Sequence, residues 1–277
     1  MKKTFEQIVN TEKSATAFFR KLCWDNYRRY CIRCHSFQYY RTAQQTMRCK
    51  RCGYTFHDFT GRWISKSQIP YRQWLLLIKF FEAELPAKQI TDKLTISYPT
   101  TLKALELLRL AIIANAPDSS SWLDYFYFRG KEWVDRQKKE ALVGVFGIIE
   151  QQGRVKIDIL KYFPMTTLIT LKPKMLRDTK IFYTDACYPY VALIFHNFKG
   201  SQQYEKQDEY QETYKINGES DFWSYAKSKI LKHRGISLDK FPHYLKELEF
   251  RYNHRDGDLF YLLCKYLVSF IPKADNE

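Results

Sequence analysis

Long apolar runs are missing from this 277-residue chain. No stretch of about 18 or more consecutive apolar residues occurs, so the sequence offers no candidate transmembrane helix. The first residues, Met1 to Glu6, also lack the apolar stretch of a secretory signal peptide. These absences argue against a membrane or secreted protein, and they predict a cytoplasmic protein without a membrane partner.

Acidic residues are the second shortage. Aspartate and glutamate number 30 against 45 lysines and arginines, which gives a formal net charge of +15. The basic residues recur along the whole chain rather than in one tail. This balance predicts a polyanionic partner such as DNA.

Aromatic residues make up 17% of the chain, a high fraction for so polar a sequence. Such rings fill small cores, and exposed rings stack on unpaired bases. We interpret most of them as core residues and leave base stacking open for the others.

Cysteine is the residue type whose spacing is most informative. The chain has seven cysteines, and an odd number argues against a complete set of disulfides. Cys31 and Cys34 form one close pair and Cys49 and Cys52 a second, with fourteen residues between the pairs. Each pair is compact enough for its two thiolates to share a tetrahedral ion. The spacing predicts a zinc ribbon, which we place at residues 23–62.

This ribbon is too small to bury a core of its own. Zinc binding, worth about 10–16 kcal/mol in small zinc modules, is therefore expected to determine whether it folds. Cys23, His35 and His57 lie nearby, but four ligands are already present, so we interpret these three as surface or packing residues. The isolated Cys187 and Cys264 are expected in the core, where free cysteine behaves as a small hydrophobe.

Helical periodicity flanks the ribbon. Residues 1–22 are interpreted as a short helix or arm, and residues 66–115 as three short helices joined by tight turns. Such helices resemble a helix-turn-helix, although a plain spacer is the alternative. In that motif the third helix faces the major groove of DNA, here with Ser97, Tyr98, Thr100, Thr101 and Lys103.

From residue 118 to residue 277 the pattern is mixed. Strands are predicted at residues 123–128, 141–150, 154–161 and 180–186. Helices are predicted at residues 165–172, 188–195, 218–233, 238–255 and 258–271. This order of strands and helices is that of a ribonuclease-H-like domain. The expected fold class is mixed α/β, with this domain after the ribbon and the helical segment.

Two aspartates stand at strand positions where an unpaired carboxylate would be unfavourable. Asp124 interrupts an aromatic strand, and Asp185 lies near the end of the strand at residues 180–186. Carboxylates from separate strands are the oxygen ligands that Mg²⁺ prefers. Two such ions about 4 Å apart can activate a nucleophile and stabilise a leaving oxygen on phosphorus. A strand-end aspartate that caps the following turn is the alternative.

Longer segments carry a resemblance to a known family. They are the stretches LDYFYFRG, GVFGIIEQQGRV and IFYTDACYPY and the block from Asn217 to Asn253, in addition to the ribbon and the helical segment. Over residues 25–270 the chain resembles the zinc-ribbon-bearing bacterial insertion-sequence transposases of the DDE type, with an ISXO-like transposase domain. In that family Asp124 would be the first catalytic acid and Asp185 the second.

The resemblance implies a fold, a reaction and partners. The fold is ribonuclease-H-like, and the cofactors are a structural Zn²⁺ and catalytic Mg²⁺ or Mn²⁺. The reaction is cleavage at transposon ends and strand transfer into target DNA. Double-stranded DNA is the implied partner, and a homo-oligomer on DNA is the implied working form.

The third acid is where the chain departs from this family. The family's helix opens with Asn-Gly-apolar-Glu, and that glutamate is Ser220 here, between Glu219 and Asp221. Ser220, and neither acid, shares its helical face with Lys227 seven residues on. Three alternatives are open: a shifted first turn that brings Glu219 to the ions, replacement of Glu219 by Asn217 or Asp221, or loss of catalysis, which leaves a DNA-binding protein. We take Glu219 as the predicted third acid.

A basic surface follows this position. It consists of Lys227, Lys229, Lys232, His233 and Arg234, which would hold phosphates, and a solvated helical face is the alternative. The aromatic and leucine positions of the same block are predicted to be core: Trp223, Tyr244, Leu245, Leu248 and Phe250. Arg251 and Asn253 fit either a structural role or a DNA contact.

Overall fold

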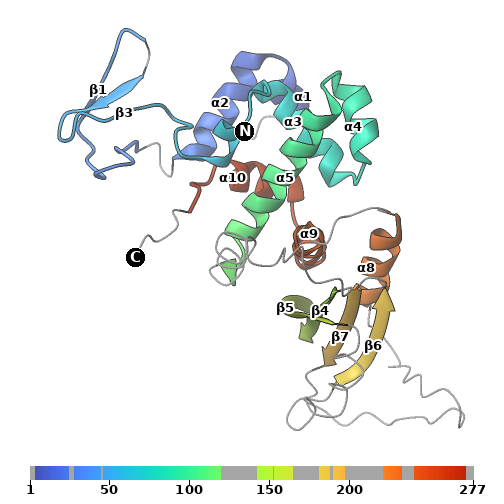
Figure 1. Cartoon of the computed structure of the whole chain (residues 1–277). Coiled ribbons are helices and arrows are strands. Elements are labelled where there is room, and N and C mark those ends of the chain that lie inside the picture. Colours follow the sequence, from blue (N-terminus) through green and yellow to red (C-terminus); the bar gives the residue numbers. More distant parts are fainter. Residues whose placement is uncertain are drawn as a thin grey trace, which may run out of the picture. The chain divides into compact units, whose positions relative to one another are not determined.

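The computed structural model describes residues 4–24, 28–44, 46–119, 142–151, 153–164, 181–187, 190–196, 221–232 and 240–272. Helices and strands are both present, as predicted for a mixed α/β chain. The chain divides into two compact units, Met1–Leu123 with Asp256–Glu277, and Asp124–Arg255; Figure 1 labels the elements of both. None of the described helices is both long and apolar enough to cross a membrane.

Two capped helices open the first unit. α1 (Phe5–Val9) and α2 (Glu12–Cys23) each follow a threonine whose hydroxyl accepts the backbone N–H of the third helical residue in a capping box. α2 buries Ala15 and Phe19 and packs against α3 (Tyr71–Glu82). The region predicted as a helix or arm is therefore helical.

A side chain of α2 caps the start of α3. The N-cap residue of α3 is Pro70, which has no side-chain acceptor. The carboxylate of Glu12 takes this role and accepts the backbone N–H groups of Tyr71 and Arg72 at 2.7 and 2.9 Å. A carboxylate at this end is also favoured by the helix dipole.

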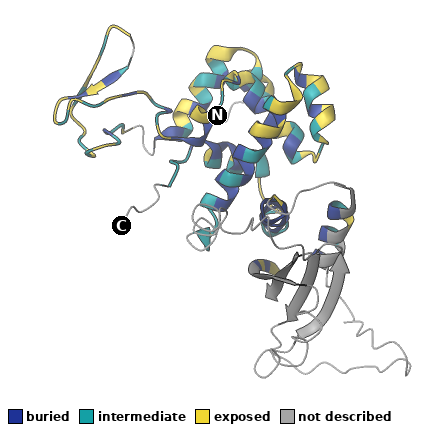
Figure 2. Ribbon diagram, in the orientation of Figure 1, coloured by how far each residue is buried: buried dark blue, intermediate teal, exposed yellow. Residues whose placement is uncertain are grey.

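Three helices form the core of this unit: α3, α4 (Ala87–Leu94) and α5 (Tyr98–Ala114). α4 packs against both of the others. Figure 2 shows exposed residues on the outer sides of these helices and buried residues on the sides that face one another. The fully buried side chains include Trp74, Leu75, Leu77, Ile78, Ile90, Ala104, Ala111 and Ile113. The periodic apolar positions predicted three short helices at residues 66–115, and three are present.

A three-residue turn, Thr95 to Ser97, joins α4 to α5. Thr95 has φ 52° and ψ 37°, in the left-handed region of backbone conformation. A β-branched residue is strained there, whereas glycine adopts the conformation freely. Ser97 then caps α5 by accepting the backbone N–H of Thr100 at 3.3 Å.

Thr95→Gly is expected to stabilise the protein against unfolding by about 1 kcal/mol. The left-handed penalty of about 1–2 kcal/mol is removed, and glycine's greater loss of chain entropy offsets part of the gain. Thr95→Ala keeps Cβ and should gain less. Chemical denaturation followed by far-UV circular dichroism measures the change. A glycine variant that is less stable than the wild type would contradict the strain argument.

The end of the chain returns to the first unit. α10 (Leu259–Leu267) packs against α2, α3 and α5 and buries Leu263, Cys264 and Leu267. The backbone N–H of Phe260, in its first turn, donates to the carboxylate of Glu82 at 3.1 Å. The sequence predicts the helix at residues 258–271 as part of the domain at 118–277. The structure places α10 with the N-terminal helices instead (Figure 1). The prediction differs because sequence periodicity identifies a helix but not the elements against which it packs.

The second unit contains a sheet whose described strands run in the order β5-β4-β7-β6. β4 (Leu142–Gln151) and β5 (Arg154–Pro164) are antiparallel, β4 is parallel to β7 (Tyr190–His196), and β7 is antiparallel to β6 (Ile181–Cys187). The strands predicted at residues 141–150, 154–161 and 180–186 are confirmed. The strand predicted at 123–128 and the helix predicted at 165–172 lie outside the described residues.

The helix predicted at residues 188–195 is wrong, because β7 occupies this position. The segment is a short apolar run that includes Val191, Ile194 and Phe195. A run of this length fits a buried strand as well as a helix, and periodicity alone does not separate the two. Pairing decides the outcome here, since β7 has β4 on one side and β6 on the other.

Two helices follow the sheet in this unit, α8 (Asp221–Lys232) and α9 (Phe241–Asn253). α9 packs against α8 and β5. Leu245, Leu248 and Phe250 are buried, as predicted for core residues, and Tyr244 is half-buried. The ring of Phe222 on α8 meets Tyr252 on α9 edge to face, with 5.1 Å between ring centres.

Side chains of α9 complete the hydrogen bonding of β5. Asn253 accepts the backbone N–H of Val155 and donates to its carbonyl oxygen, both at 2.7 Å. Glu249 accepts the backbone N–H of Ile157 at 2.9 Å and the ammonium of Lys246 at 2.7 Å. Residues one turn apart on the helix thus meet alternate residues of the strand. These side chains hold the backbone groups that another strand would otherwise pair with.

Arg251 and Asn253 are therefore both engaged inside the fold. The guanidinium of Arg251 is buried and donates to the carboxylate of Glu247 at 2.9 Å. The two roles that the sequence left open are resolved in favour of structure, because neither side chain is free to reach a phosphate.

Asn253→Ala is expected to destabilise the second unit by about 1–3 kcal/mol, because it leaves the N–H and C=O of the buried Val155 without partners. Ser228→Ala is a suitable control, since that exposed hydroxyl contacts only a carbonyl of its own helix. Denaturation and amide hydrogen exchange at Val155 measure the effect. Equal stability of the two variants would show that Asn253 does not stabilise β5.

Candidate metal centre and DNA-contacting surfaces

The ribbon is built on a small antiparallel sheet of β1 (Tyr39–Arg41), β2 (Met47–Cys49) and β3 (Thr55–Phe56). The first cysteine pair precedes β1, and the second begins at the end of β2 and continues into the following turn. Pairing of β1 with β2 brings the two cysteine pairs to one site.

The positions of the four sulfur atoms fit a zinc ion. All four lie within 4.8 Å of one another. Cys31 Sγ is 3.6 Å from Cys52 Sγ, and Cys34 Sγ is 3.5 Å from Cys49 Sγ. A tetrahedral zinc ion with bonds of about 2.3 Å separates its sulfur ligands by about 3.8 Å. Within the described part of the chain, this is the one group of side chains with the spacing of a metal site.

The surroundings of Cys49 favour the thiolate form that zinc binds. Burial acts to raise the pKa of Cys49, but hydrogen bonds from the backbone N–H groups of Cys52 and Arg51 outweigh it, and the pKa falls to about 6. At Cys34 a backbone hydrogen bond at Ser36 lowers the pKa, but burial and the three neighbouring thiols outweigh it and raise the pKa to about 12. Met47 and Phe56 are buried and pack against the cysteines. The ribbon thus has a small apolar cluster around its cysteines.

Cys23, His35 and His57 stay outside the sulfur cluster, as predicted. Burial raises the pKa of Cys23 to about 12, so this thiol stays protonated. His57 accepts the backbone N–H of Phe59 through Nδ1 at 3.1 Å and shapes a turn. The ring of His35 lies 5.6 Å from that of Tyr30.

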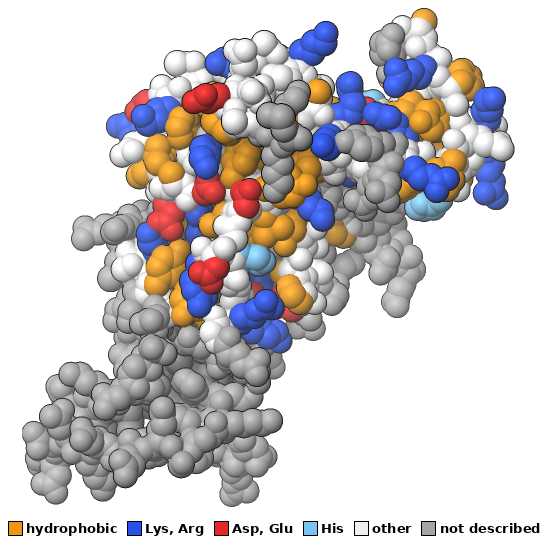
Figure 3. Space-filling view, turned by 180° about the vertical axis from the view of Figure 1, so that it is seen from behind, with side chains coloured by type: hydrophobic (Ala, Val, Ile, Leu, Met, Phe, Trp, Pro, Cys, Tyr) orange, Lys and Arg blue, Asp and Glu red, His pale blue; other side chains and the backbone are white. Residues whose placement is uncertain are grey.

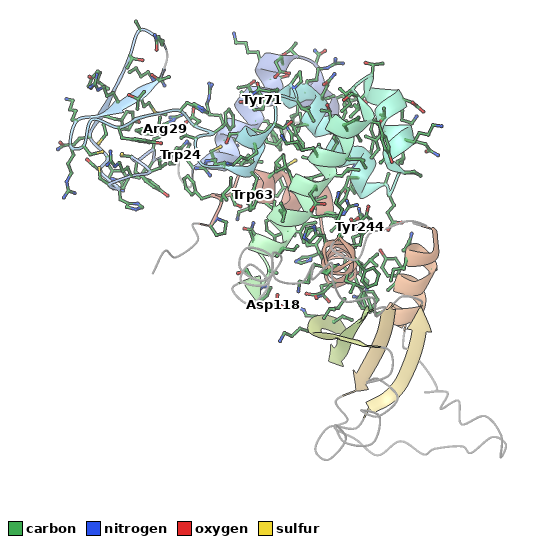
Figure 4. The ribbon with its side chains drawn as sticks, viewed as in Figure 1. Trp24, Arg29, Trp63, Tyr71, Asp118 and Tyr244 are labelled. Atoms are coloured by element: carbon green, nitrogen blue, oxygen red, sulfur yellow. The ribbon has the colours of Figure 1, made fainter. Side chains whose placement is uncertain are left out.

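Asp58 connects the ribbon to the helices of its unit. Its carboxylate accepts the indole N–H of Trp24 at 2.7 Å and pairs with the guanidinium groups of Arg29 at 2.6 Å and Arg20 at 2.8 Å. Figure 4 shows Trp24 and Arg29 close together at this junction. No local pattern predicts the role of Asp58, because its partners lie far upstream in the sequence.

Arg62 forms a second connection next to Asp58. It is only 3% exposed, and it donates to three backbone carbonyls, those of Cys23, Asp58 and Val268. Its guanidinium also lies over the ring of Phe270, 3.9 Å from the ring centre. One buried cation thus holds the end of α2, the end of the ribbon and the C-terminal segment together.

Thr101 is a correction to the predicted groove-facing set. Its side chain is fully buried, and its hydroxyl accepts a hydrogen bond from Thr91 of α4 at 2.8 Å. It also donates to the carbonyl of Ser97 at 3.3 Å. Thr101 therefore holds α4 to α5 and is buried within this unit rather than exposed on its surface.

The exposed part of α5 begins with Tyr98, which is 49% exposed. Lys103 is exposed, and Thr100 is half-buried with its hydroxyl 2.7 Å from that of Ser97. Leu102, at 37% exposed, lies on the same face one turn after Tyr98 and is absent from the predicted groove-facing set. The spacing of four residues was the available signal.

Of the predicted catalytic acids, Asp185 lies within a described strand. It stands on β6, opposite Ala192 of β7. The other positions of interest fall outside the described residues: Asp124, Glu219, Ser220 and Arg234. Their mutual arrangement stays a prediction.

The predicted basic surface falls on α8, which carries Lys227, Lys229 and Lys232. The ammonium of Lys229 is 5.4 Å from the ring centre of Tyr225, one turn earlier on the same helix. Contact of these lysines with phosphate stays a prediction.

Two family models match the chain. The model of the transposase zinc-ribbon domain matches residues 10–55, and that of the ISXO2-like transposase domain matches residues 123–253. The first range contains all four cysteines of the sulfur cluster. The second contains Asp124, Asp185 and Glu219.

Two relatives support these matches. An uncharacterized protein in transposable element ISH50 of Halobacterium salinarum is 21% identical over 270 residues, which cover 87% of this chain and 90% of that protein. An uncharacterized transposase-like protein of Haemophilus influenzae is 30% identical over 107 residues, which cover 37% of this chain and 83% of that protein. No solved structure matches the chain. The chain belongs to the insertion-element transposases that carry a zinc ribbon and an ISXO2-like transposase domain.

Proposed function

We propose that this transposase binds the ends of its insertion element and catalyses metal-dependent DNA cleavage and strand transfer. Its transposase domain takes a ribonuclease-H-like fold, in which Asp124, Asp185 and Glu219 hold two Mg²⁺ or Mn²⁺ ions. Ions held there would supply Lewis-acid activation of water, for hydrolysis at the element end, and of the freed 3′ hydroxyl, for attack on target DNA. No covalent protein nucleophile is needed.

The observation that carries this proposal is the match of the ISXO2-like transposase domain over residues 123–253, which spans the three acids. The remainder of the chain supplies DNA-binding modules: the zinc ribbon at residues 23–62 and a helix-turn-helix at residues 66–115. In this helix-turn-helix, α5 presents Tyr98, Thr100 and Lys103 to the major groove, together with the exposed Leu102. Lys227, Lys229, Lys232 and Arg234 hold phosphates beside the catalytic site.

The partners follow from the reaction. Double-stranded DNA is both the element end and the target, and the reaction takes place in the cytoplasm. Two element ends must be brought together, so the working form is a homo-oligomer on DNA. This last point rests on analogy with the family.

A catalytically degenerate transposase that only binds DNA is the second candidate. Ser220 favours it, because a hydroxyl stands where the family has its third carboxylate. The two candidates differ in one experiment: incubation of the zinc-loaded protein with duplexes carrying the element's ends in Mn²⁺. Strand cleavage at the ends supports the enzyme, whereas tight binding without cleavage supports the second candidate.

DNA binding is expected to weaken roughly a hundredfold or more between about 50 and 200 mM salt, because a chain with a net charge of +15 releases several counterions on contact with phosphates. Lys103→Ala should lower the slope of log affinity against log salt by about 1 if Lys103 meets one phosphate. Lys265→Ala, on the exposed side of α10, is the control and should leave the slope unchanged. If the DNA affinity of the wild type did not change with salt concentration, the positive charge of the chain would not serve to bind DNA.

A further inference from the structure

The ribbon sheet has one face turned to the cysteines and one turned to solvent. On the first, Met47, Cys49 and Phe56 are buried in the cluster around the metal site. On the second, Arg48 is exposed, as are its cross-strand partners Tyr40 on β1 and Thr55 on β3. Cross-strand partners project from the same side of a sheet, so these three residues form one row on the solvent face.

The ribbon carries a second exposed pair of a ring and an arginine. Phe37 is 58% exposed, and the guanidinium of Arg28 lies 5.3 Å from its ring centre. Tyr40, at 47%, and Phe37 are two of the five large hydrophobic side chains exposed in the described part of the chain. We call these two exposed sets of the ribbon, Arg28 with Phe37 and Tyr40 with Arg48 and Thr55, together the ribbon patch.

The charge of the ribbon restricts what the ribbon patch can bind. Residues 26–57 contain seven lysines and arginines and no aspartate or glutamate. Figure 3 shows basic and hydrophobic side chains interleaved over this part of the surface. A second copy of the same ribbon would bring like charges together, which disfavours a homodimer contact. Phosphate groups match the charge.

Phosphate binding alone does not explain the exposed rings. Arginine and lysine suffice to hold the backbone of a duplex, whose bases keep their faces stacked on one another. A ring exposed beside an arginine fits a base whose face is free, because stacking buries the ring while the arginine holds the neighbouring phosphate. Unpaired bases therefore suit both parts of the ribbon patch.

We propose that the ribbon patch binds single-stranded DNA, with unpaired bases stacked on Tyr40 and Phe37 and phosphates held by Arg48 and Arg28. The proposal rests on the proposed function and adds to it a preference of the ribbon for unpaired DNA. Under this proposal, single-strand binding depends on zinc, since the metal fixes the sheet that carries Tyr40 and Arg48.

Fluorescence anisotropy with the zinc-loaded full chain tests this proposal. The probes are a labelled single strand of about 20 nucleotides and the duplex formed with its complement. Tyr40→Ala should weaken binding to the single strand about tenfold and change binding to the duplex less than about twofold. Tyr40→Trp should retain single-strand binding, and Arg48→Ala should weaken binding to both the single strand and the duplex. Tyr261→Ala is the matched control, because Tyr261 is also 47% exposed but lies on α10.

Other outcomes overturn the proposal. Base stacking at the ribbon patch is excluded if Tyr40→Ala keeps its full zinc content and loses affinity equally for both probes, or for neither. Loss of self-association in sedimentation without loss of single-strand binding would identify the patch as a protein interface. A wild type that binds the duplex but not the single strand would end this inference and leave the proposed function intact. Binding to neither probe, nor to the element's ends, would remove the proposed function as well.

Discussion

Cys34→Ser is expected to release the zinc ion and unfold residues 30–55, while the second unit keeps its structure. The buried cluster of the ribbon consists of Cys31, Met47, Cys49 and Phe56, too few side chains to hold a fold without the metal. Zinc binding contributes about 10–16 kcal/mol in modules of this size, and a serine hydroxyl is a poor substitute for a thiolate. Zinc content, measured by atomic absorption, should fall from about one equivalent to a small fraction, and amide exchange across residues 30–55 should become fast.

Cys23→Ala is the control for this substitution. Cys23 is buried near the ribbon but stays outside the sulfur cluster, so the variant should keep its zinc. Less than half an equivalent of zinc in reduced, unchelated wild-type protein would contradict the site itself. A Cys34→Ser protein that retains a full equivalent would show that this thiol is not a ligand.

Local patterns predicted the elements whose chemistry is local. The cysteine spacing located the metal site because two ligands with only two residues between them must share one turn, whatever surrounds them. The helices α3, α4 and α5 followed from apolar residues three and four positions apart. Asp185 was placed correctly on a strand, because its segment is rich in β-branched and aromatic residues.

Features that depend on distant partners were beyond local patterns. α10 was recognised as a helix, but its contacts with α2, α3 and α5 join the two ends of the chain. Asp58 and Arg62 act through partners at α2 and in the C-terminal segment, and no regular sequence spacing links these residues to those partners. β7 was read as a helix because strand pairing, and not its own sequence, selects its conformation.

Motif resemblance also does not say which way a side chain faces. Thr101 lies in the helix expected to meet DNA, yet it faces α4 and is buried. Arg251 and Asn253 belong to the most family-like block of the sequence, yet they pair with Glu247 and with the backbone of β5. A residue can therefore stand in a functional motif because the fold of that domain requires it.

The catalytic acids give the second large expected effect. If the protein is an active enzyme, Asp124→Asn and Asp185→Asn should each lower end cleavage on the order of a thousandfold or more and leave DNA binding unchanged. An amide keeps the shape of the side chain but removes the charge that holds the metal ions, and several kcal/mol of transition-state stabilisation are lost with them. Asp158→Asn is the matched control, since Asp158 lies on β5 of the same sheet and outside the predicted acids. Cleavage that survives both Asp124→Asn and Asp185→Asn would contradict the two-metal mechanism.

Position 220 separates the active enzyme from the degenerate one. Glu219→Gln should abolish cleavage only if the first turn of its helix is shifted towards the ions. If the helix begins at residue 218 as the sequence predicts, Ser220→Glu restores a carboxylate to the face of Lys227. It should then raise cleavage in a protein weakened by this departure, whereas Ser220→Ala should not. Gel analysis of labelled element ends in Mn²⁺ measures all of these variants. A wild type that never nicks its own ends, with no rescue by Ser220→Glu, would leave a DNA-binding protein on an inherited catalytic scaffold.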